Sequence, residues 1–316
     1  MELALQIARP WRGATSPNPP VGAVALTQDG RVLGMAAHKK SGEPHAEAQV
    51  LRICREQGTL SQVHTLVVTL EPCNHQGKTP PCTESILQAG VKHVVFGSRD
   101  PNPKVKGGGA ERLREAGIQV TEGILLLPCE ELIRPFAHWV RTGRPWVTLK
   151  TAWRKEGQGI NPQRMTMIPP QGQRTFTSPD SLRLAHELRK RADAILTGSG
   201  TVLIDQPQFT VRQVPDHLGK KRWLIILDRR RRTNKSWIQD RENTGFNILL
   251  MDDVETALTL LGQKGCLEVL VEAGPSLSGF FLEKSLWNEH ILILQGDPPG
   301  SPDTVESRIN CLSTAS

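Results

Sequence analysis

The sequence predicts an α/β protein of two domains, and three observations support this. Short apolar runs alternate with segments of helical spacing along most of the chain, a pattern that produces a largely parallel sheet with both faces covered by helices. A length of 316 residues corresponds to about two domains. The polar segment Arg141–Pro145, which contains Gly and Pro, interrupts the alternation. We therefore expect one domain over residues 1–142 and a second over residues 143–316.

The first series of elements covers the N-terminal domain. Val21–Leu26 is an apolar run, and a Gln-Asp-Gly turn signal connects it to a second strand at Val32–Ala36. Glu43–Arg55 places its apolar residues at helical spacing, which predicts a helix. Apolar runs, proline starts and glycine stops predict the other elements. These are helices at Glu2–Arg9, Thr83–Ala89 and Ala110–Ala116, and strands at Leu66–Leu70, Val91–Phe96 and Ile118–Val120.

The second series begins with a strand at Trp146–Thr151. A helix at Ser181–Arg191 follows, because a Ser-Pro-Asp sequence supplies capping chemistry at its start. The other predicted elements are strands at Ala194–Gly198, Trp223–Asp228, Asn247–Met251, Glu268–Glu272 and His290–Leu294, and helices at Val254–Leu261 and Ser276–Ser285. The tail Gln295–Ser316 is rich in Gly, Pro and Ser, and we expect it to be poorly ordered.

Composition excludes several classes of function. The chain has no Tyr, which excludes a reductase built on a Tyr–Lys pair. Its apolar runs are far shorter than the roughly 18 residues that span a bilayer, and its start lacks a signal-peptide pattern, so we expect a cytoplasmic protein without a membrane partner. Six Cys are too few for a disulfide scaffold, which leaves reduced thiols or a metal site. The net charge of +7 suits a phosphorylated substrate, a dinucleotide or nucleic acid, or merely aids solubility.

One constellation points to chemistry: His45-Ala46-Glu47, followed by Pro72-Cys73 and by Cys82. Zinc favours imidazole and thiolate ligands, and three of them leave a fourth position for a water whose pKa falls to about 7. Glu47 need not be a ligand, so it can move a proton from that water to a leaving amine. Taken alone, His-x-Glu is typical of a surface pair and two Cys of buried apolar residues. Their order here is that of the zinc deaminases, and a structural zinc site would supply four ligands.

Longer motifs give a resemblance that covers nearly all of residues 1–140. They are Ser16–Val24, Pro44–Glu47, Thr69–Cys82 and Asp100–Pro103. In these motifs the chain resembles the deaminase half of the bifunctional riboflavin-biosynthesis deaminase–reductases. The resemblance implies a cytidine-deaminase-like three-layer α/β/α domain. It also implies hydrolytic deamination of 2,5-diamino-6-ribosylamino-4(3H)-pyrimidinone 5′-phosphate.

The same resemblance assigns roles to individual residues of this domain. It implies His45, Cys73 and Cys82 as zinc ligands and Glu47 as the proton shuttle. It further implies that four polar residues line the substrate pocket, namely Asn18, His38, His75 and Lys78. Their chemistry suits the task, because an Asn side chain can read a pyrimidine edge with a donor and an acceptor, and a Lys attracts phosphate. Without the motif, each would be interpreted as a polar loop residue.

The second half resembles the reductase half of the same family, through Trp146–Ala152, Ser178–Arg212 and Val271–Gly279. The resemblance implies a dihydrofolate-reductase-like α/β domain that uses NADPH to convert the ribose side chain to ribitylamino. It implies cofactor contacts at Ala152, Thr201, Asp205, Arg229, Gly274, Pro275, Ser276 and Gly279, and substrate contacts at Arg189, Phe209, Arg212 and Glu272. Physically, Gly274 lets backbone approach a phosphate at a helix start, and Arg189 and Arg212 can hold a second phosphate.

The run Arg229–Arg232 follows the strand Trp223–Asp228 and admits two interpretations. It is either a solvated charged loop, or Arg229 or a neighbour pairs with the 2′-phosphate that distinguishes NADPH from NADH. Three departures from the family also matter. The turn after the first strand is Arg154–Gly157, Thr175 replaces a Trp, and the C-terminus is short. We therefore expect an incomplete sheet and a weakened, remodelled or inactive reductase.

Two alternatives remain open at this point. One is a deaminase whose second domain is only a scaffold or dimerisation module. The other is a nucleic-acid-editing deaminase with a basic binding domain, which the charge would suit. The leading interpretation takes a pyrimidine ribosyl phosphate and NADPH as its small-molecule partners, with zinc bound and no nucleic acid. The family resemblance also implies a homo-oligomer.

Overall fold

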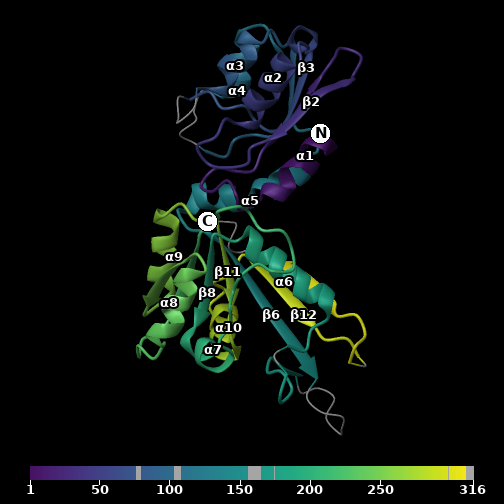
Figure 1. The fold of residues 1–316 in the computed structure, drawn as a ribbon. Helices are drawn as coiled ribbons and strands as arrows, with labels where there is room; N and C mark the ends of the chain where they lie inside the picture. Colours follow the sequence, from purple (N-terminus) through teal and green to yellow (C-terminus); the bar gives the residue numbers. More distant parts are fainter. Residues whose placement is uncertain (76–79, 103–107, 156–164, 174, 298, 311–316) are drawn as a thin grey trace. The chain divides into compact units, whose positions relative to one another are not determined.

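The computed structural model describes residues 1–75, 80–102, 108–155, 165–173, 175–297 and 299–310. Contacts divide the chain into two compact units, Met1–Arg141 and Thr142–Ser316 (Figure 1). Each unit contains a sheet with helices on both of its faces, so the predicted α/β class is confirmed.

The N-terminal sheet has the strand order β2-β1-β3-β4-β5. The strands are β1 (Gly22–Leu26), β2 (Val32–Ala37), β3 (Thr65–Leu70), β4 (His93–Ser98) and β5 (Gln119–Thr121). The strands β3, β4 and β5 run parallel, whereas β1 is antiparallel to both β2 and β3. The prediction of a largely parallel sheet is therefore wrong here, because β1 and β2 form a hairpin and β1 runs against β3.

Helices form the outer layers of this unit. They are α1 (Glu2–Ala8), α2 (Ala46–Glu56), α3 (Cys82–Gln88), α4 (Gly109–Glu115) and α5 (Leu126–Thr142), with short 3-10 turns η1 (Arg9–Trp11) and η2 (Leu60–Gln62). A Cβ on Gly22 would lie 2.0 Å from the Ala4 carbonyl oxygen, and one on Gly97 would lie 2.1 Å from Cys129 Sγ. These glycines therefore allow α1 and α5 to pack closely on one face, while α2, α3 and α4 cover the other (Figure 1).

The C-terminal sheet has the order β10-β9-β8-β11-β6-β12-β13, with β7 paired to β6 outside this path. The strands are β6 (Trp146–Lys155), β7 (Met165–Thr166), β8 (Ala194–Gly198), β9 (Arg222–Leu227), β10 (Phe246–Met251), β11 (Glu268–Glu272), β12 (Glu289–Leu294) and β13 (Thr304–Ile309). The six strands from β10 to β12 run parallel, and β13 is antiparallel to β12. This sheet is largely parallel, as predicted.

Alternating side chains on each central strand meet helices on opposite faces. The helices are α6 (Pro179–Arg191), α7 (Ser199–Asp205), α8 (Lys235–Asn243), α9 (Val254–Gln263) and α10 (Pro275–Glu283). On β11, Val269 and Val271 share a core cluster with residues of α9 and α10, whereas Leu270 packs with Leu188 of α6. Successive side chains point to opposite faces, and helices cover both faces. The buried strands of a parallel sheet therefore appear as continuous apolar runs.

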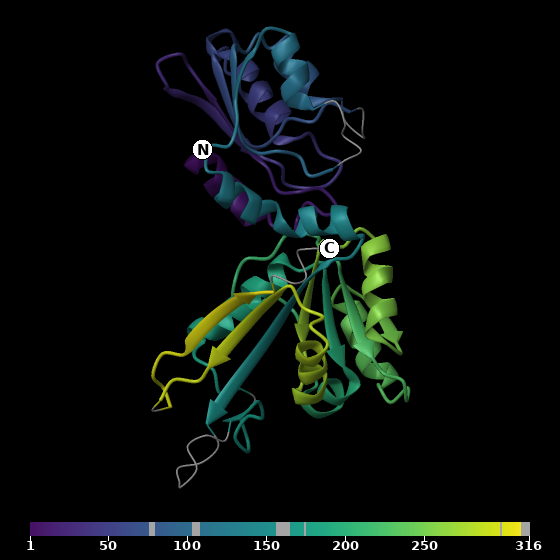
Figure 2. The same cartoon turned by 180° about the vertical axis from the view of Figure 1, so that it is seen from behind.

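The structure corrects the prediction for the tail. The sequence predicts a poorly ordered tail over residues 295–316 and an incomplete sheet. Residues 298 and 311–316 lie outside the described residues. Before them, β13 pairs with β12 along six residues, from Thr304 opposite Leu294 to Ile309 opposite Glu289. Figure 2 shows these two yellow strands side by side. Asp303 anchors the connection, because its carboxylate accepts hydrogen bonds from Ser178 N–H at 2.7 Å and Gly296 N–H at 3.2 Å.

Candidate active site

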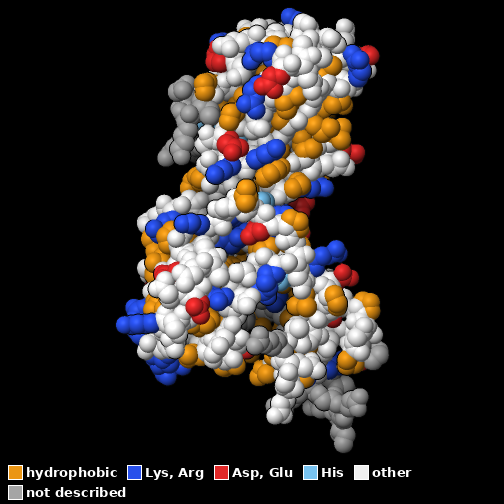
Figure 3. Space-filling model, in the orientation of Figure 1, with side chains coloured by type: hydrophobic (Ala, Val, Ile, Leu, Met, Phe, Trp, Pro, Cys, Tyr) orange, Lys and Arg blue, Asp and Glu red, His pale blue; other side chains and the backbone are white. Residues whose placement is uncertain are grey.

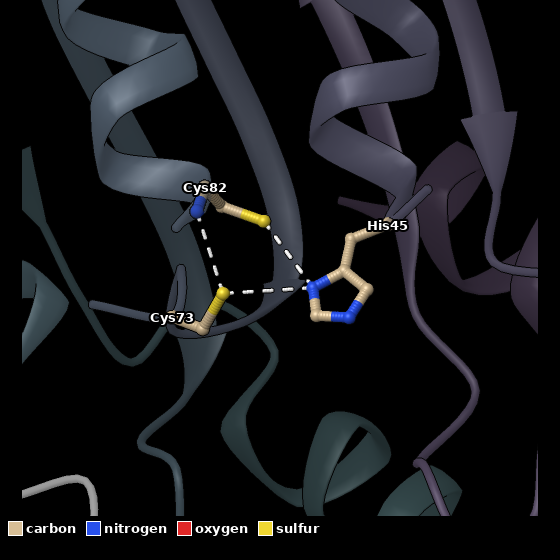
Figure 4. A group of neighbouring side chains, drawn as sticks. All are labelled: His45, Cys73 and Cys82. Carbon is tan, nitrogen blue, oxygen red and sulfur yellow. Dashed lines mark hydrogen bonds between the residues drawn. The ribbon is translucent and has the colours of Figure 1, made fainter. Parts of the chain in front are cut away.

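Three side chains converge at one end of the N-terminal sheet (Figure 4). His45 immediately precedes α2, Cys73 follows β3, and Cys82 is the first residue of α3. His45 Nδ1 lies 3.5 Å from Cys73 Sγ and 3.3 Å from Cys82 Sγ. In the part of the chain that the structure describes, these residues form one group whose ligand atoms all lie within 4.8 Å of one another.

This group fits zinc in both donor type and spacing. A tetrahedral zinc with one imidazole and two thiolates separates neighbouring ligand atoms by about 3.6 Å, close to the two distances found. Three protein ligands leave one position open, which is typical of a catalytic zinc and not of a structural one.

The two thiols interact strongly with each other. A hydrogen bond from the Cys82 side chain, supported by His45, lowers the pKa of Cys73 to about 4. The backbone N–H of Cys82 also donates to Cys73 Sγ at 3.4 Å. The same contact with Cys73, together with burial, raises the pKa of Cys82. Cys73 therefore holds the negative charge in this pair, and a thiolate is the form that binds a metal.

Glu47 lies beside the three ligands but is not one of them. It occupies the first turn of α2, is 3% exposed, and its Oε2 has no hydrogen-bond partner among the described residues. Burial raises its pKa, against the opposing charge of His45. A buried carboxylate oxygen without a partner is costly, so it marks a place where a reacting group completes the site.

His45, Cys73 and Glu47 border a cavity of about 300 Å³. Three of the predicted pocket residues, Asn18, His38 and His75, also line it. Lys78 lies outside the described residues. Within the cavity wall, His38 Nδ1 lies 3.3 Å from the Pro44 carbonyl oxygen, and its Nε2 lies 3.4 Å from the Asn18 amide nitrogen. Burial, followed by the charge of His45, lowers the pKa of His38, which favours a neutral ring that donates to Pro44 and accepts from Asn18.

Sequence analysis did not assign roles to several other cavity residues. Asp100 and Asn102 line the cavity, and their Asp-Pro-Asn-Pro motif could have pointed to them. Glu71 positions this loop, because its carboxylate accepts from Asp100 N–H at 3.3 Å and Ala110 N–H at 3.0 Å. Phe136 and Trp139 of α5 complete the lining, and no sequence signal indicated them.

The residues expected to contact NADPH lie near the carboxyl ends of neighbouring parallel strands. Ala152 is on β6, Thr201 lies on α7 just after β8, and Arg229 follows β9. Gly274 precedes α10, directly after β11, and its N–H donates to Thr201 Oγ1 at 3.0 Å. Pro275, Ser276 and Gly279 belong to α10, and Asp205 ends α7. The carboxyl edge of a parallel sheet is where such folds bind their ligands.

The residues expected to contact the reductase substrate form a network on the same sheet. Arg189 donates two hydrogen bonds to Glu272, at 2.7 and 3.2 Å, and Lys150 Nζ lies 3.9 Å from the same carboxylate. The backbone N–H of Arg212 donates to His186 Nδ1 at 2.9 Å. Phe209 differs from the others, because its ring is buried in a core cluster and so supports the fold beneath the network.

Three of the four consecutive arginines make contacts that separate them into two groups. Arg229 Nε donates to the Asp252 carbonyl oxygen at 2.7 Å, and Arg231 pairs with the Asp252 carboxylate at 3.2 Å. Arg232 reaches α7 instead, where its guanidinium donates to Ser199 Oγ at 3.0 Å. Elsewhere on the face shown in Figure 3, Lys and Arg lie scattered with Asp and Glu among them.

Two family models match the chain. Residues 1–98 match the zinc-binding region of cytidine and deoxycytidylate deaminases, and residues 166–295 match the RibD C-terminal domain. The riboflavin biosynthesis proteins RibD of Aquifex aeolicus and of Escherichia coli K12 are each 34% identical to it. The matches cover 93% of this chain and 85% and 86% of those proteins, respectively.

Solved structures give the same result. Acinetobacter baumannii RibD has a TM-score of 0.79 at 32% identity, covering 95% of this chain and 86% of that one. The diaminohydroxyphosphoribosylaminopyrimidine deaminase/5-amino-6-(5-phosphoribosylamino)uracil reductase of Thermotoga maritima has a TM-score of 0.76 at 31% identity, covering 96% and 87%. Within the described ranges, no helix has the length and apolar character needed to cross a membrane.

The second half matches the RibD C-terminal domain and RibD structures along its length, so neither the scaffold nor the nucleic-acid-editing alternative is favoured. The resemblance inferred from the motifs is confirmed. The chain belongs to the RibD family of riboflavin biosynthesis, whose members combine a zinc-binding deaminase domain with a reductase domain.

Proposed function

We propose that residues 1–142 deaminate 2,5-diamino-6-ribosylamino-4(3H)-pyrimidinone 5′-phosphate and that residues 143–316 then reduce its ribose side chain with NADPH. One observation carries the deaminase assignment: Glu47 Oε2 is buried without a partner, beside a three-ligand zinc site that borders a cavity. Zinc bound by His45, Cys73 and Cys82 would act as a Lewis acid that makes water nucleophilic at neutral pH.

The protein's own groups then perform the proton transfers. Glu47 Oε2 takes a proton from the attacking water and delivers it to the amino group that leaves as ammonia. Its raised pKa suits both steps, because the carboxyl holds the proton while the ring carbon is attacked. Asn18 and the neutral His38 present polar atoms to the edge of the pyrimidine, and Lys78 attracts the phosphate.

In the second step, NADPH would supply a hydride when bound at the carboxyl edge of the C-terminal sheet. The backbone around Gly274 would approach its pyrophosphate, because this residue has no Cβ and opens α10. Arg189 already makes two hydrogen bonds to Glu272, so Arg212 offers the freer positive charge for the substrate phosphate. Glu272 contacts the reacting ribose side chain.

The substitution Glu47→Gln tests the deaminase assignment. The amide keeps the shape of the side chain but cannot carry the transferred proton, so we expect full zinc content and a loss of deamination of about 100-fold or more. Metal analysis and ammonia release measure the two quantities, and reduction of the deaminated pyrimidine in the same preparation is the control. Normal ammonia release by this variant would overturn the assignment.

The family resemblance also supports a homo-oligomer, and we include this assembly and a cytoplasmic location in the proposal. Light scattering coupled to size-exclusion chromatography measures the assembly directly. A monomer at micromolar concentration that turns over both substrates would remove the oligomer from the proposal.

A further inference from the structure

The deaminase cavity has an aromatic side that none of the assigned residues accounts for. Phe136 and Trp139 both line the cavity, and both come from α5. Residues three apart on a helix lie on the same face, which places the two rings together. Their centroids are 6.5 Å apart and their planes differ by 35°. They therefore form one continuous apolar surface, called the aromatic wall below.

The aromatic wall lies outside the segments that the two family models match. The zinc-binding family model ends at residue 98 and the reductase model begins at residue 166, whereas α5 covers Leu126–Thr142. The wall is thus independent of the His-x-Glu and Cys signature that identifies the deaminase.

The helix that bears the wall is firmly attached to the sheet. Cys129, Leu132 and Ile133 are buried in the main core cluster of the unit, and Gly97 lets the helix approach β4 closely. Phe136 is only 7% exposed. A ring held in this way loses little conformational freedom when a ligand binds, so its contact area contributes to affinity with a small entropic cost.

The remaining cavity lining combines polar groups with smaller aliphatic residues such as Val21 and Leu70. Polar groups of Asn18, His38 and Asn102 border the cavity together with Glu47. A pyrimidine needs hydrogen-bond partners around its edge and apolar contact on its flat faces. The polar residues satisfy the edge, and the aromatic wall is the surface with the extent and chemistry to cover a face.

We propose that Phe136 and Trp139 hold the face of the pyrimidine ring and so bind the substrate of the deaminase. This inference rests on the proposed deaminase function. Base–aromatic stacking is sequence-tolerant because it uses the ring face alone. The wall would therefore set affinity for planar heteroaromatic rings, while the polar residues select among them.

Kinetics of variants on α5 test the proposal. For Trp139→Ala we expect the KM for deamination to rise about 5- to 100-fold, the range for loss of one stacking contact. Trp139→Phe retains an aromatic face and should stay within about threefold of the wild type. Phe136→Leu, which keeps apolar volume at a buried position, should raise the KM by an intermediate factor, and kcat should change less than KM in every variant.

The chain itself provides the controls. Leu127→Ala alters a residue on the same helix that is 76% exposed, and it should leave the KM unchanged. Zinc content and reduction of the deaminated pyrimidine report on folding of the two units in each preparation. If Trp139→Ala and Phe136→Leu both keep the wild-type KM, the aromatic wall does not bind the ring. If the wild-type enzyme does not deaminate the pyrimidine at all, the proposed function fails and the inference falls with it.

Discussion

Two buried glutamates show how surroundings set the protonation of single residues. Burial alone would raise the pKa of both carboxyls, because it disfavours their charged forms. At Glu272 the charges of Arg189 and Lys150 outweigh burial, and the pKa lies below its usual range. At Glu47 burial prevails, and the pKa is raised. Glu272 is thus a stable anion in a network, whereas Glu47 can hold a proton, which is the property its proposed role requires.

The buried His186 should make the free energy of unfolding depend on pH. It is 4% exposed, and burial, followed by the charges of Arg189 and Arg212, lowers its pKa to about 4. In the unfolded chain the ordinary value of 6.5 returns. Between pH 6.5 and 4 the unfolded state therefore binds more protons than the folded state, and the free energy of unfolding falls as the pH falls.

The substitution His186→Gln isolates this effect. A Gln side-chain oxygen can accept the Arg212 N–H without titrating, so the free energy of unfolding should depend less steeply on pH between 6.5 and 4. Urea unfolding at several pH values measures this slope, and other titrating groups such as His138 contribute equally to both proteins. Identical slopes in the two proteins would contradict the prediction.

The turn between β9 and α8 carries the arginines that we expect to influence the choice between NADPH and NADH. Asp228 closes this turn, because its Oδ2 accepts the Thr233 N–H at 2.7 Å and the Thr233 hydroxyl at 2.8 Å. Within the turn, Arg232 lies against Ser199 at the start of α7, while Arg229 is directed to Asp252. The geometry therefore favours Arg232 over Arg229 as the neighbour of the 2′-phosphate.

We expect Arg232→Ala to lower the preference for NADPH over NADH by about tenfold or more, the cost of one charge-assisted contact. Arg229→Ala is the matched control, and it should change the ratio by less than about threefold. The ratio of kcat/KM values for the two cofactors, measured with the deaminated pyrimidine, checks both. A larger effect at Arg229 than at Arg232 would reverse the assignment.

Elements with local signals were predictable from the sequence, and elements held by distant contacts were not. The strands around Val67 and Leu224 and the helix that follows His45 have clear apolar patterns. In contrast, α5 contains Pro135 in its interior, which argues against a helix, and its core contacts override this effect. The strand β13 has mostly exposed side chains, so it forms through edge pairing and the Asp303 anchor.

The same distinction applies to the sites. The zinc ligands and Glu47 belong to short motifs whose order and chemistry require them together, so the sequence could indicate them. The aromatic wall depends on how α5 packs against β4, which involves Gly97 and Cys129. Such packing arises only in three dimensions. The orientations of Arg229, Arg231 and Arg232 likewise depend on Asp252 and Ser199, which lie far away in the sequence.

Among the described residues of the whole molecule, each of the two compact units has core clusters of its own. The clusters around Leu66 and Val24 lie in Met1–Arg141, and those around Val269, Leu224 and Leu270 lie in Thr142–Ser316. The candidate zinc ligands belong to the first unit alone. Metal loss should therefore affect one activity and spare the other.

Treatment with a zinc chelator tests this separation. We expect ammonia release from the diaminopyrimidine to be lost and then restored by added zinc. Reduction of the deaminated pyrimidine, followed by NADPH absorbance, should remain within about twofold of the untreated enzyme, since the second unit keeps its own core. Parallel loss of both activities would show that folding of the two units is linked.

The packing of α5 also determines where this chain can be divided for grafting or for structural work on one half. A recombinant piece that ends with the zinc-binding match, at residue 98, would contain all the ligands and still lack α4, β5 and α5. Its exposed β4 would lose the cover that Cys129, Leu132 and Ile133 provide. A usable deaminase fragment must extend to Arg141, where the first compact unit ends.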